Sequence, residues 1–151
     1  MNDRNPSPVL EIKDLTVAYR RGQRWLQAVQ GVSLCIEAGQ TYGLVGESGS
    51  GKSTLVLAVM RYLGENGAVR GGKIVLHGQD LLGLDQEQMR RVWGQQIAMV
   101  PQNPASSLNP SIRIGEQLAE ALRHQRDLSD TDARLQAIEL LESVPISDPK
   151  R

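Results

Sequence analysis

The sequence predicts an α/β fold in which a buried strand passes through a glycine-rich turn directly into a helix. Residues 40–46 (QTYGLVG) form a nearly continuous apolar run, which is typical of a strand covered on both faces. The segment that follows the glycines, KSTLVLAVMRYLG, repeats its apolar residues at helical spacing, and Gly64 is expected to end the helix. The length of 151 residues indicates one domain of modest size.

The segments before this unit favour antiparallel strands. Residues 1–8 are polar, contain two prolines and are expected to be a flexible N-terminus. Residues 9–19 and 27–39 each alternate apolar and polar side chains, which is typical of half-buried strands. After the helix, residues 73–77 predict one more strand, which ends in a turn at Gly78.

The second half of the chain is predicted to be mainly helical. Asp85 and Gln88 make an N-terminal capping box, so a helix is expected over residues 86–93. Residues 96–100 predict a short strand that Pro101 stops, and a stiff loop with two further prolines follows. Two more helices are expected over residues 112–125 and 130–144. The first places four apolar side chains on one face: Ile114, Leu118, Ala121 and Leu122.

Composition narrows the function classes. The chain has 17 basic and 17 acidic residues, and this balance argues against a nucleic-acid binder held by bulk charge. Cys35 is the only cysteine, so no intramolecular disulfide can form, and we expect it to be a small buried apolar residue. The longest apolar run, residues 55–60, is far shorter than the roughly 20 residues that cross a bilayer. Any role at a membrane is therefore expected to depend on a partner.

The glycine-rich turn carries the clearest chemical signal. GESGSGKS matches the pattern G-x-x-x-x-G-K-[ST]. Backbone N–H groups bent inward by glycine torsions form an anion-binding concavity, and the helix N-terminus adds its positive dipole end. Lys52 supplies a charge for the β- and γ-phosphates, and the Ser53 hydroxyl can bind Mg²⁺. A plain glycine turn explains neither residue. The predicted phosphate site comprises Gly46, Glu47, Ser48, Gly49, Ser50, Gly51, Lys52, Ser53 and Thr54.

The loop alone fits kinases, GTPases and several classes of ATPase. Residues 80–83 (DLLG) match the D-x-x-G that GTPases use near the γ-phosphate. Asp80, however, follows a turn instead of ending a strand, and the sequence contains no N-K-x-D guanine-binding motif. The GTPase interpretation is therefore not favoured.

Two further residues narrow the choice. Tyr19 ends LTVAY, where a strand would lead into the loop RRGQRW, and IAMVPQN places Gln102 at the end of a strand. Each could be an ordinary strand or loop residue on its own. Together with the glycine loop and its spacing, they resemble the nucleotide-binding subunit of an ABC transporter. On that resemblance Tyr19 stacks on adenine, and Gln102 contacts Mg²⁺ and the attacking water, which makes Lys52 and Gln102 the expected catalytic residues.

Three segments resemble the ATPases of oligopeptide, dipeptide and nickel importers in particular: GGKIVLHGQDLLGLD, RRVWGQQIAMVPQNPASSLNP and IGEQLAEAL. The resemblance implies a P-loop NTPase core over residues 9–110 and the start of a helical subdomain over 111–151. ATP and Mg²⁺ are the implied cofactors. The implied partners are permease subunits, a second ATP-binding subunit, identical or different, and indirectly an extracytoplasmic solute-binding protein, with no nucleic acid. The implied location is peripheral, on the cytoplasmic face of a bacterial or archaeal inner membrane.

The sequence also departs from that family. It has no apolar run leading into Asp-Glu and no L-S-G-G-Q, since residues 128–132 (LSDTD) start alike and then differ. His77 and His124 lie too early to be the histidine of the switch loop. We therefore interpret the chain as truncated, with two functions open: an ATP-hydrolysing importer subunit, or a nucleotide-binding remnant that does not hydrolyse. The balanced charge does not favour a third option, an ABC-type repair or translation ATPase.

Overall fold

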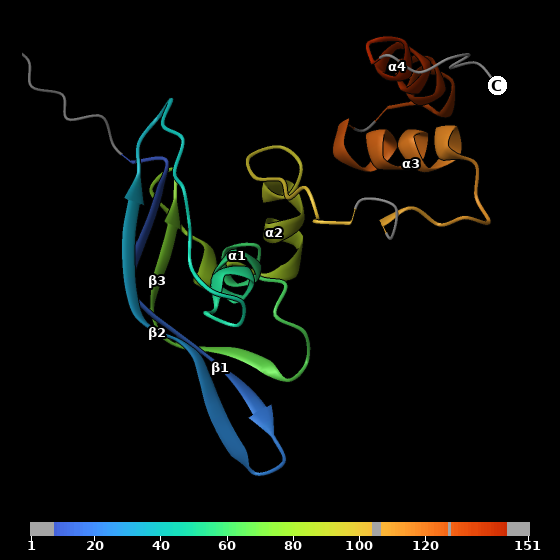
Figure 1. The fold of residues 1–151 in the computed structure, drawn as a ribbon. Coiled ribbons are helices and arrows are strands. Elements are labelled where there is room, and N and C mark those ends of the chain that lie inside the picture. The colour runs from blue at the N-terminus through green and yellow to red at the C-terminus, as the bar shows by residue number, and fades with distance from the viewer. Residues whose placement is uncertain (1–7, 104–106, 127, 145–151) are drawn as a thin grey trace, which may run out of the picture. The chain divides into compact units, whose positions relative to one another are not determined.

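A computed structural model describes residues 8–103, 107–126 and 128–144, except for the side chains at positions 124 and 125 (Figure 1). Most of the expected flexible N-terminus, Pro104 and the residues after 144 therefore lie outside the described residues. The chain divides into two compact units, residues 1–90 and residues 91–151. Each unit is described by itself.

The first unit is built on a four-stranded antiparallel sheet with the strand order β2-β1-β3-β4. The strands are β1 (Leu10–Arg21), β2 (Arg24–Ile36), β3 (Gly67–Leu76) and β4 (Gln79–Asp80). The predicted antiparallel strands are thus confirmed, although β3 begins six residues earlier and β2 three residues earlier than the sequence indicated. β1 and β2 continue through RRGQRW as a hairpin in which Arg21 pairs with Arg24. Tyr19 therefore lies within β1 and not at its end.

Helix α1 (Lys52–Val59) packs its apolar residues on the sheet, next to the strands β1 and β2 (Figure 1). Its buried residues are Leu55, Ala58 and Val59. With residues from the strands, the turn after β4 and the next helix they form the core of this unit: Ile12, Leu15, Val17, Ala18, Val29, Ile74, Leu76, Leu81 and Met89. Cys35 is exposed, so the prediction that it is buried is wrong. It lies on β2, an edge strand of the sheet, where alternate residues face solvent.

The end of α1 differs from the prediction. The residue that ends the helix is Arg61, which follows the cap residue Met60 and takes the left-handed conformation with φ +53°, whereas Gly64, with φ +73°, lies three residues further on. The N–H of Tyr62 donates to the Leu57 carbonyl at 2.7 Å and the N–H of Arg61 to the Ala58 carbonyl at 3.0 Å, which is a Schellman motif. The Arg61 guanidinium also donates to the Leu81 carbonyl at 3.0 Å and to the Leu84 carbonyl. These bonds offset the strain of the backbone and connect α1 to the turn after β4.

Helix α2 (Gln86–Val92) begins as predicted. The N–H of Gln88 donates to Asp85 Oδ1 at 2.8 Å, and the N–H of Asp85 donates to Gln88 Oε1 at 2.9 Å. These two bonds are the expected capping box. The short helix η1 (Leu81–Gly83) precedes it, with Asp80 accepting a hydrogen bond from the N–H of Leu82. Asp80 thus has a structural role in the DLLG segment.

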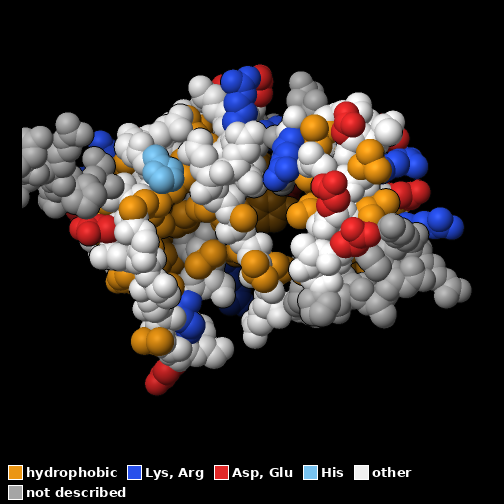
Figure 2. All heavy atoms as spheres, turned by 90° about the horizontal axis from the view of Figure 1, so that it is seen from above, with side chains coloured by type: hydrophobic (Ala, Val, Ile, Leu, Met, Phe, Trp, Pro, Cys, Tyr) orange, Lys and Arg blue, Asp and Glu red, His pale blue; other side chains and the backbone are white. Residues whose placement is uncertain are grey.

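Two predicted strands are not formed. Residues 40–46 have no strand partner among the described residues, and Tyr42, Leu44 and Val45 are 51%, 41% and 91% exposed. In residues 96–100 only Ile97 makes a single bridge, to Trp93. A strand of the parallel type is stable only when neighbouring strands and covering helices take up its backbone and side-chain groups. Apolar side chains are accordingly open on the surface, as Figure 2 shows.

The second unit contains α3 (Ile114–Arg126) and α4 (Asp130–Glu142), which pack on each other. Its core is small: Ala119, Leu122, Ala133 and Ala137, with Leu118 and Leu128 partly buried against them. The predicted apolar face of the first helix is only partly right, because Ile114 is 52% exposed and Ala121 is also exposed. No helix among the described residues is long and apolar enough to span a membrane.

Candidate phosphate-binding site

The glycine-rich loop, residues 46–51, leads directly into α1 in the first unit. Gly49 and Gly51 have φ values of +82° and +90°, which side chains with a Cβ atom rarely adopt. Gly51 is the N-terminal cap residue of α1. The two glycines therefore turn the backbone so that the loop curls at the positive end of the helix dipole.

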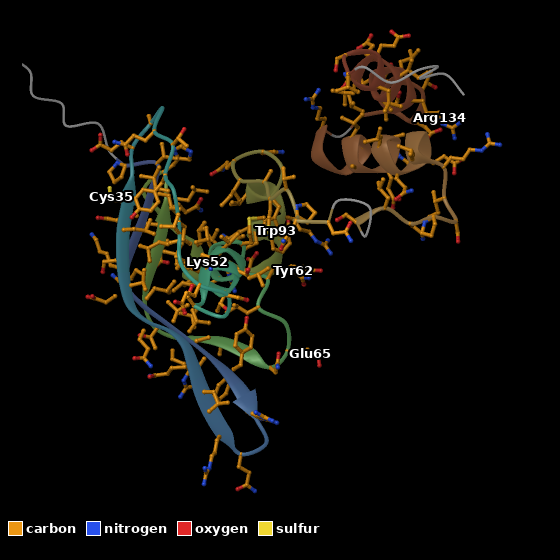
Figure 3. The ribbon with its side chains drawn as sticks, in the orientation of Figure 1. Cys35, Lys52, Tyr62, Glu65, Trp93 and Arg134 are labelled. Carbon is orange, nitrogen blue, oxygen red and sulfur yellow. The ribbon has the colours of Figure 1, made fainter. Side chains whose placement is uncertain are left out.

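Lys52 points back into this loop. Its ammonium donates to the carbonyl oxygens of Gly46 at 2.7 Å and Glu47 at 2.6 Å, and to the Ser50 hydroxyl at 3.2 Å. Figure 3 shows Lys52 at the start of α1. The carbonyls of the loop thus hold the positive charge in the concavity that the sequence predicts for phosphate.

Gly51 is required for a second reason, which the sequence motif does not reveal. A Cβ atom at this position would lie 2.5 Å from the carbonyl oxygen of Ala28 and 3.3 Å from Cγ2 of Val29, both on β2. The loop is therefore packed directly against the edge strand of the sheet. Only glycine permits this approach without moving the backbone of one or the other.

The start of α1 is open to a ligand. No side chain caps the helix, and its first helical bond is donated by Leu55 to the Gly51 carbonyl at 2.9 Å. The backbone N–H groups of Lys52, Ser53 and Thr54 therefore have no partner within the helix. An anion at this end would receive hydrogen bonds from them and interact favourably with the helix dipole.

A cavity of about 400 Å³ adjoins the loop. Its lining comes from β2, from residues 44 and 45, from the loop and from the start of α1. Its volume lies within the range that is usual for small-molecule sites. The lining residues are Gln27, Ala28, Val29, Gln30, Val32, Leu44, Val45, Gly46, Ser50, Gly51, Lys52 and Leu55. Sequence reasoning missed the β2 residues, because alternation in a strand indicates burial but not which loop will contact it.

The other predicted site residues do not line this cavity, and none of their contacts bears on the roles predicted for them. Tyr19 is half-buried in β1, opposite Gly67 of β3, and does not line the cavity. A Cβ atom on Gly67 would lie 2.8 Å from Cε1 of Tyr19, so the ring packs over that glycine. Glu47, Ser48 and Ser53 are exposed. Gln102 is also exposed, but it belongs to the second unit.

The family follows from a comparison with known proteins. A family model described as ABC transporter matches residues 29–151, which include the loop, α1 and every later element. The chain belongs to the ABC transporter family. Its fold is that of part of the ATP-binding domain of this family, as the sequence predicted.

Two curated relatives are informative about length. A Brucella melitensis biotype 1 protein named "Putative peptide import ATP-binding protein BMEII0863" is 43% identical over 95% of this chain and 44% of its own length. A Brucella abortus strain 2308 protein, "Putative peptide import ATP-binding protein BAB2_1052", is 41% identical over 96% of this chain and also 44% of its own length. The chain therefore spans less than half the length of these ABC relatives.

A solved structure agrees in fold. It is described as "Dimeric structure of a post-hydrolysis state of the ATP-binding cassette MJ0796 bound to ADP and Pi", and it superposes with a TM-score of 0.72 at 23% identity. The match covers 92% of this chain and 58% of that chain. A second structure of the same cassette gives a TM-score of 0.69 at 20% identity.

In this ABC chain the segment that begins like L-S-G-G-Q has a structural role. Ser129 is the N-cap of α4: its hydroxyl accepts from the N–H of Asp132 at 3.2 Å and donates to the Asp132 carboxylate at 2.6 Å. His77 lies in the turn before β4, with φ +48°. The side chain of His124 is outside the described residues.

Proposed function

We propose that the chain is the ATP-binding part of an ABC importer subunit that energises the uptake of peptides or of a related solute such as nickel. The observation that carries this proposal is the position of the Lys52 ammonium, within 2.6–2.7 Å of two loop carbonyls and next to the uncapped start of α1. The names of the curated relatives support peptide import.

The roles that we propose follow from the chemistry of each group. Lys52 and the backbone N–H groups of the loop bind the β- and γ-phosphates. The other residues of this site shape or line the loop: Gly46, Glu47, Ser48, Gly49, Ser50, Gly51 and Thr54. Tyr19 stacks on adenine. The Ser53 hydroxyl and the Gln102 amide oxygen are hard oxygen donors, which suits Mg²⁺. A bound Mg²⁺ would neutralise charge on the phosphates, and Gln102 would orient the attacking water.

We further propose that this subunit works on the cytoplasmic face of a bacterial or archaeal inner membrane. Permease subunits and a second ATP-binding subunit would be its partners there, with an extracytoplasmic solute-binding protein as an indirect one. Support for the second ATP-binding subunit comes from the related cassette, whose solved structure is described as dimeric.

A second candidate is nucleotide binding without turnover by these 151 residues alone. Among the described residues, those that line the cavity include neither a carboxylate nor a histidine. Hydrolysis needs a group that orients or deprotonates water near the γ-phosphate. Phosphate release measured on the isolated chain separates the two candidates, since turnover that depends on Lys52 excludes the binding-only function.

The proposal is tested first by calorimetry with Mg·ADP and Mg·ATP on the 151-residue chain and on Lys52→Ala. Removing a charged donor from the phosphates costs about 1.5–3 kcal/mol, so affinity should fall roughly tenfold to hundredfold. Lys13→Ala is the matched control, because Lys13 lies on β1 and pairs with Glu11 at 2.9 Å. Equal affinity in all three proteins, or no heat with folded wild-type chain, contradicts the proposal.

A further inference from the structure

Positive charge is concentrated on the sheet of the first unit. The chain as a whole has net charge zero, yet residues 15–36 contain three arginines and no acidic residue. Residues 66–79 of the neighbouring segment add Arg70 and Lys73, again with no acidic residue. All five side chains are exposed, and none has a carboxylate partner among the described residues. These charges are therefore not neutralised by ion pairs, and the acidic residue nearest to β3 in the sequence is Glu65, beside Asn66, whose carbonyl accepts from the N–H of Arg20 at 2.7 Å.

Three of these cations lie at the turn of the β1–β2 hairpin, and the fourth lies on β3. We call them the arginine arm: Arg20, Arg21, Arg24 and Arg70. Arg21 pairs with Arg24 across the hairpin turn. The Arg70 guanidinium lies over the ring of Trp25, 5.0 Å from its centroid, which holds this charge against β2. Figure 3 shows nitrogen-tipped side chains extending outward from this end of the hairpin.

Strand β2 connects the arginine arm with the glycine-rich loop. A second hollow, of about 430 Å³, is lined by Trp25, Arg70 and four neighbouring residues. Two of those neighbours, Gln27 and Gln30, also line the cavity beside the loop. From Arg24 to Ala28, whose carbonyl faces Gly51, the strand extends about 13 Å. An anion at the hairpin is thus next to a row of β2 residues that continues to the cavity lined by Lys52.

We propose that the arginine arm guides nucleoside triphosphates and diphosphates to the loop by long-range electrostatic attraction, without contacting the bound nucleotide. This inference rests on the proposed nucleotide-binding function and adds a role for residues outside the motif. A region of one charge sign beside a cleft raises the local concentration of an oppositely charged ligand and its association rate. The Debye length is about 30 Å at 0.01 M salt, about 10 Å at 0.1 M and about 3 Å at 1 M. Guidance over about 13 Å must therefore fade as salt is added.

The test is stopped-flow association of a fluorescent ADP analogue with Mg²⁺, across ionic strengths from about 10 mM to 500 mM. In the triple variant Arg20→Gln, Arg21→Gln, Arg24→Gln we expect the association rate at low salt to fall about threefold to tenfold. The dissociation rate should stay within twofold of the wild-type value. The two proteins should converge at high salt, because screening removes the attraction in both.

The matched control is the triple variant Arg20→Lys, Arg21→Lys, Arg24→Lys, which keeps the charge and should keep the wild-type association rate and salt slope. Circular dichroism of each variant establishes that the sheet is intact. An association rate in the glutamine variant equal to that of the wild type at low salt overturns the inference, and so does a loss confined to the dissociation rate.

The inference and the proposed function fail in distinguishable ways. If the wild-type chain binds no nucleotide in the calorimetric titration, the proposed function fails before any rate is measured. If the chain binds nucleotide with an affinity that depends on Lys52, but the association rate does not depend on the arginines, only the guidance role is wrong.

Discussion

Gly51 shows how a single residue connects the glycine-rich loop with the sheet. Its φ of +90° shapes the loop, and the absence of a side chain lets the carbonyl of Ala28 approach to a distance that a Cβ atom would forbid. The two requirements are separate, because one concerns the local backbone and the other a contact with a different strand. A substitution at this position should therefore affect both the loop and β2.

We expect Gly51→Ala to lower the free energy of unfolding by about 1–3 kcal/mol and also to weaken nucleotide binding. The matched control is Gly39→Ala, since Gly39 has φ +76° but a Cβ atom added there would meet no other atom within 4 Å. The control carries the backbone strain without the clash. Urea denaturation and nucleotide titration measure the two effects. Equal losses of stability and unchanged affinity in both variants would show that the approach of Ala28 is unimportant.

At the residue scale, the motif predicted that the glycine turn leads into a helix at Lys52, but it did not predict what surrounds the loop. The pattern G-K-[ST] identified Lys52 because an ammonium beside successive N–H groups has a chemical purpose that a turn lacks. It could not identify Gln27 or Gln30, since nothing local to β2 encodes which loop packs beside it. Cys35 was wrongly expected in the core, because alternation does not say which strand lies at the edge of a sheet.

Among the elements, those with local signals were predicted best. The capping box of α2 and the turn at Gly78 depend on neighbouring residues, and both formed as expected. The apolar runs at 40–46 and 96–100 instead indicate buried strands. Their side chains become buried only where other strands and helices pack against them. Among the described residues the only pairing of these runs is the single bridge of Ile97 to Trp93, so most of their apolar side chains remain exposed.

The N-cap of α4 allows an element-scale prediction. Ser129→Ala removes the acceptor for the N–H of Asp132 and should destabilise α4 by about 1 kcal/mol. Ser143→Ala is the control at the other end of the same helix, where the hydroxyl only donates to the Leu140 carbonyl. The control should cost less than half as much. Thermal denaturation followed by circular dichroism compares them, and an equal effect of both substitutions would argue against a cap.

On the scale of the whole molecule, each compact unit contains one tryptophan: Trp25 lies in the first and Trp93 in the second. Trp93→Phe therefore leaves a reporter for the unit with the glycine-rich loop. Trp25→Phe leaves Trp93, directly after α2, as a reporter for the second unit, which we call the helical unit because it contains α3 and α4. The cores differ in size, because the helical unit buries mainly alanines with Leu122. The larger aliphatic core of the first unit should make that unit the more stable of the two.

We expect two fluorescence transitions in urea, with the Trp93 signal changing at the lower concentration. Saturating Mg·ADP, at about 100 times its dissociation constant, should stabilise the unit that binds it by about 2.7 kcal/mol and move the Trp25 transition. The Trp93 transition should move much less. Coincident transitions that shift together with nucleotide would instead show that the two units unfold cooperatively.

The contact between Ala28 and Gly51 has a wider consequence, because β2 is the outermost strand and its far side has no strand partner among the described residues. A molecule that adds a strand along this edge is coupled to the loop only if it shifts the carbonyl that faces Gly51. Thermodynamic reciprocity then requires that recognition at the edge and occupancy of the loop alter each other by the same factor.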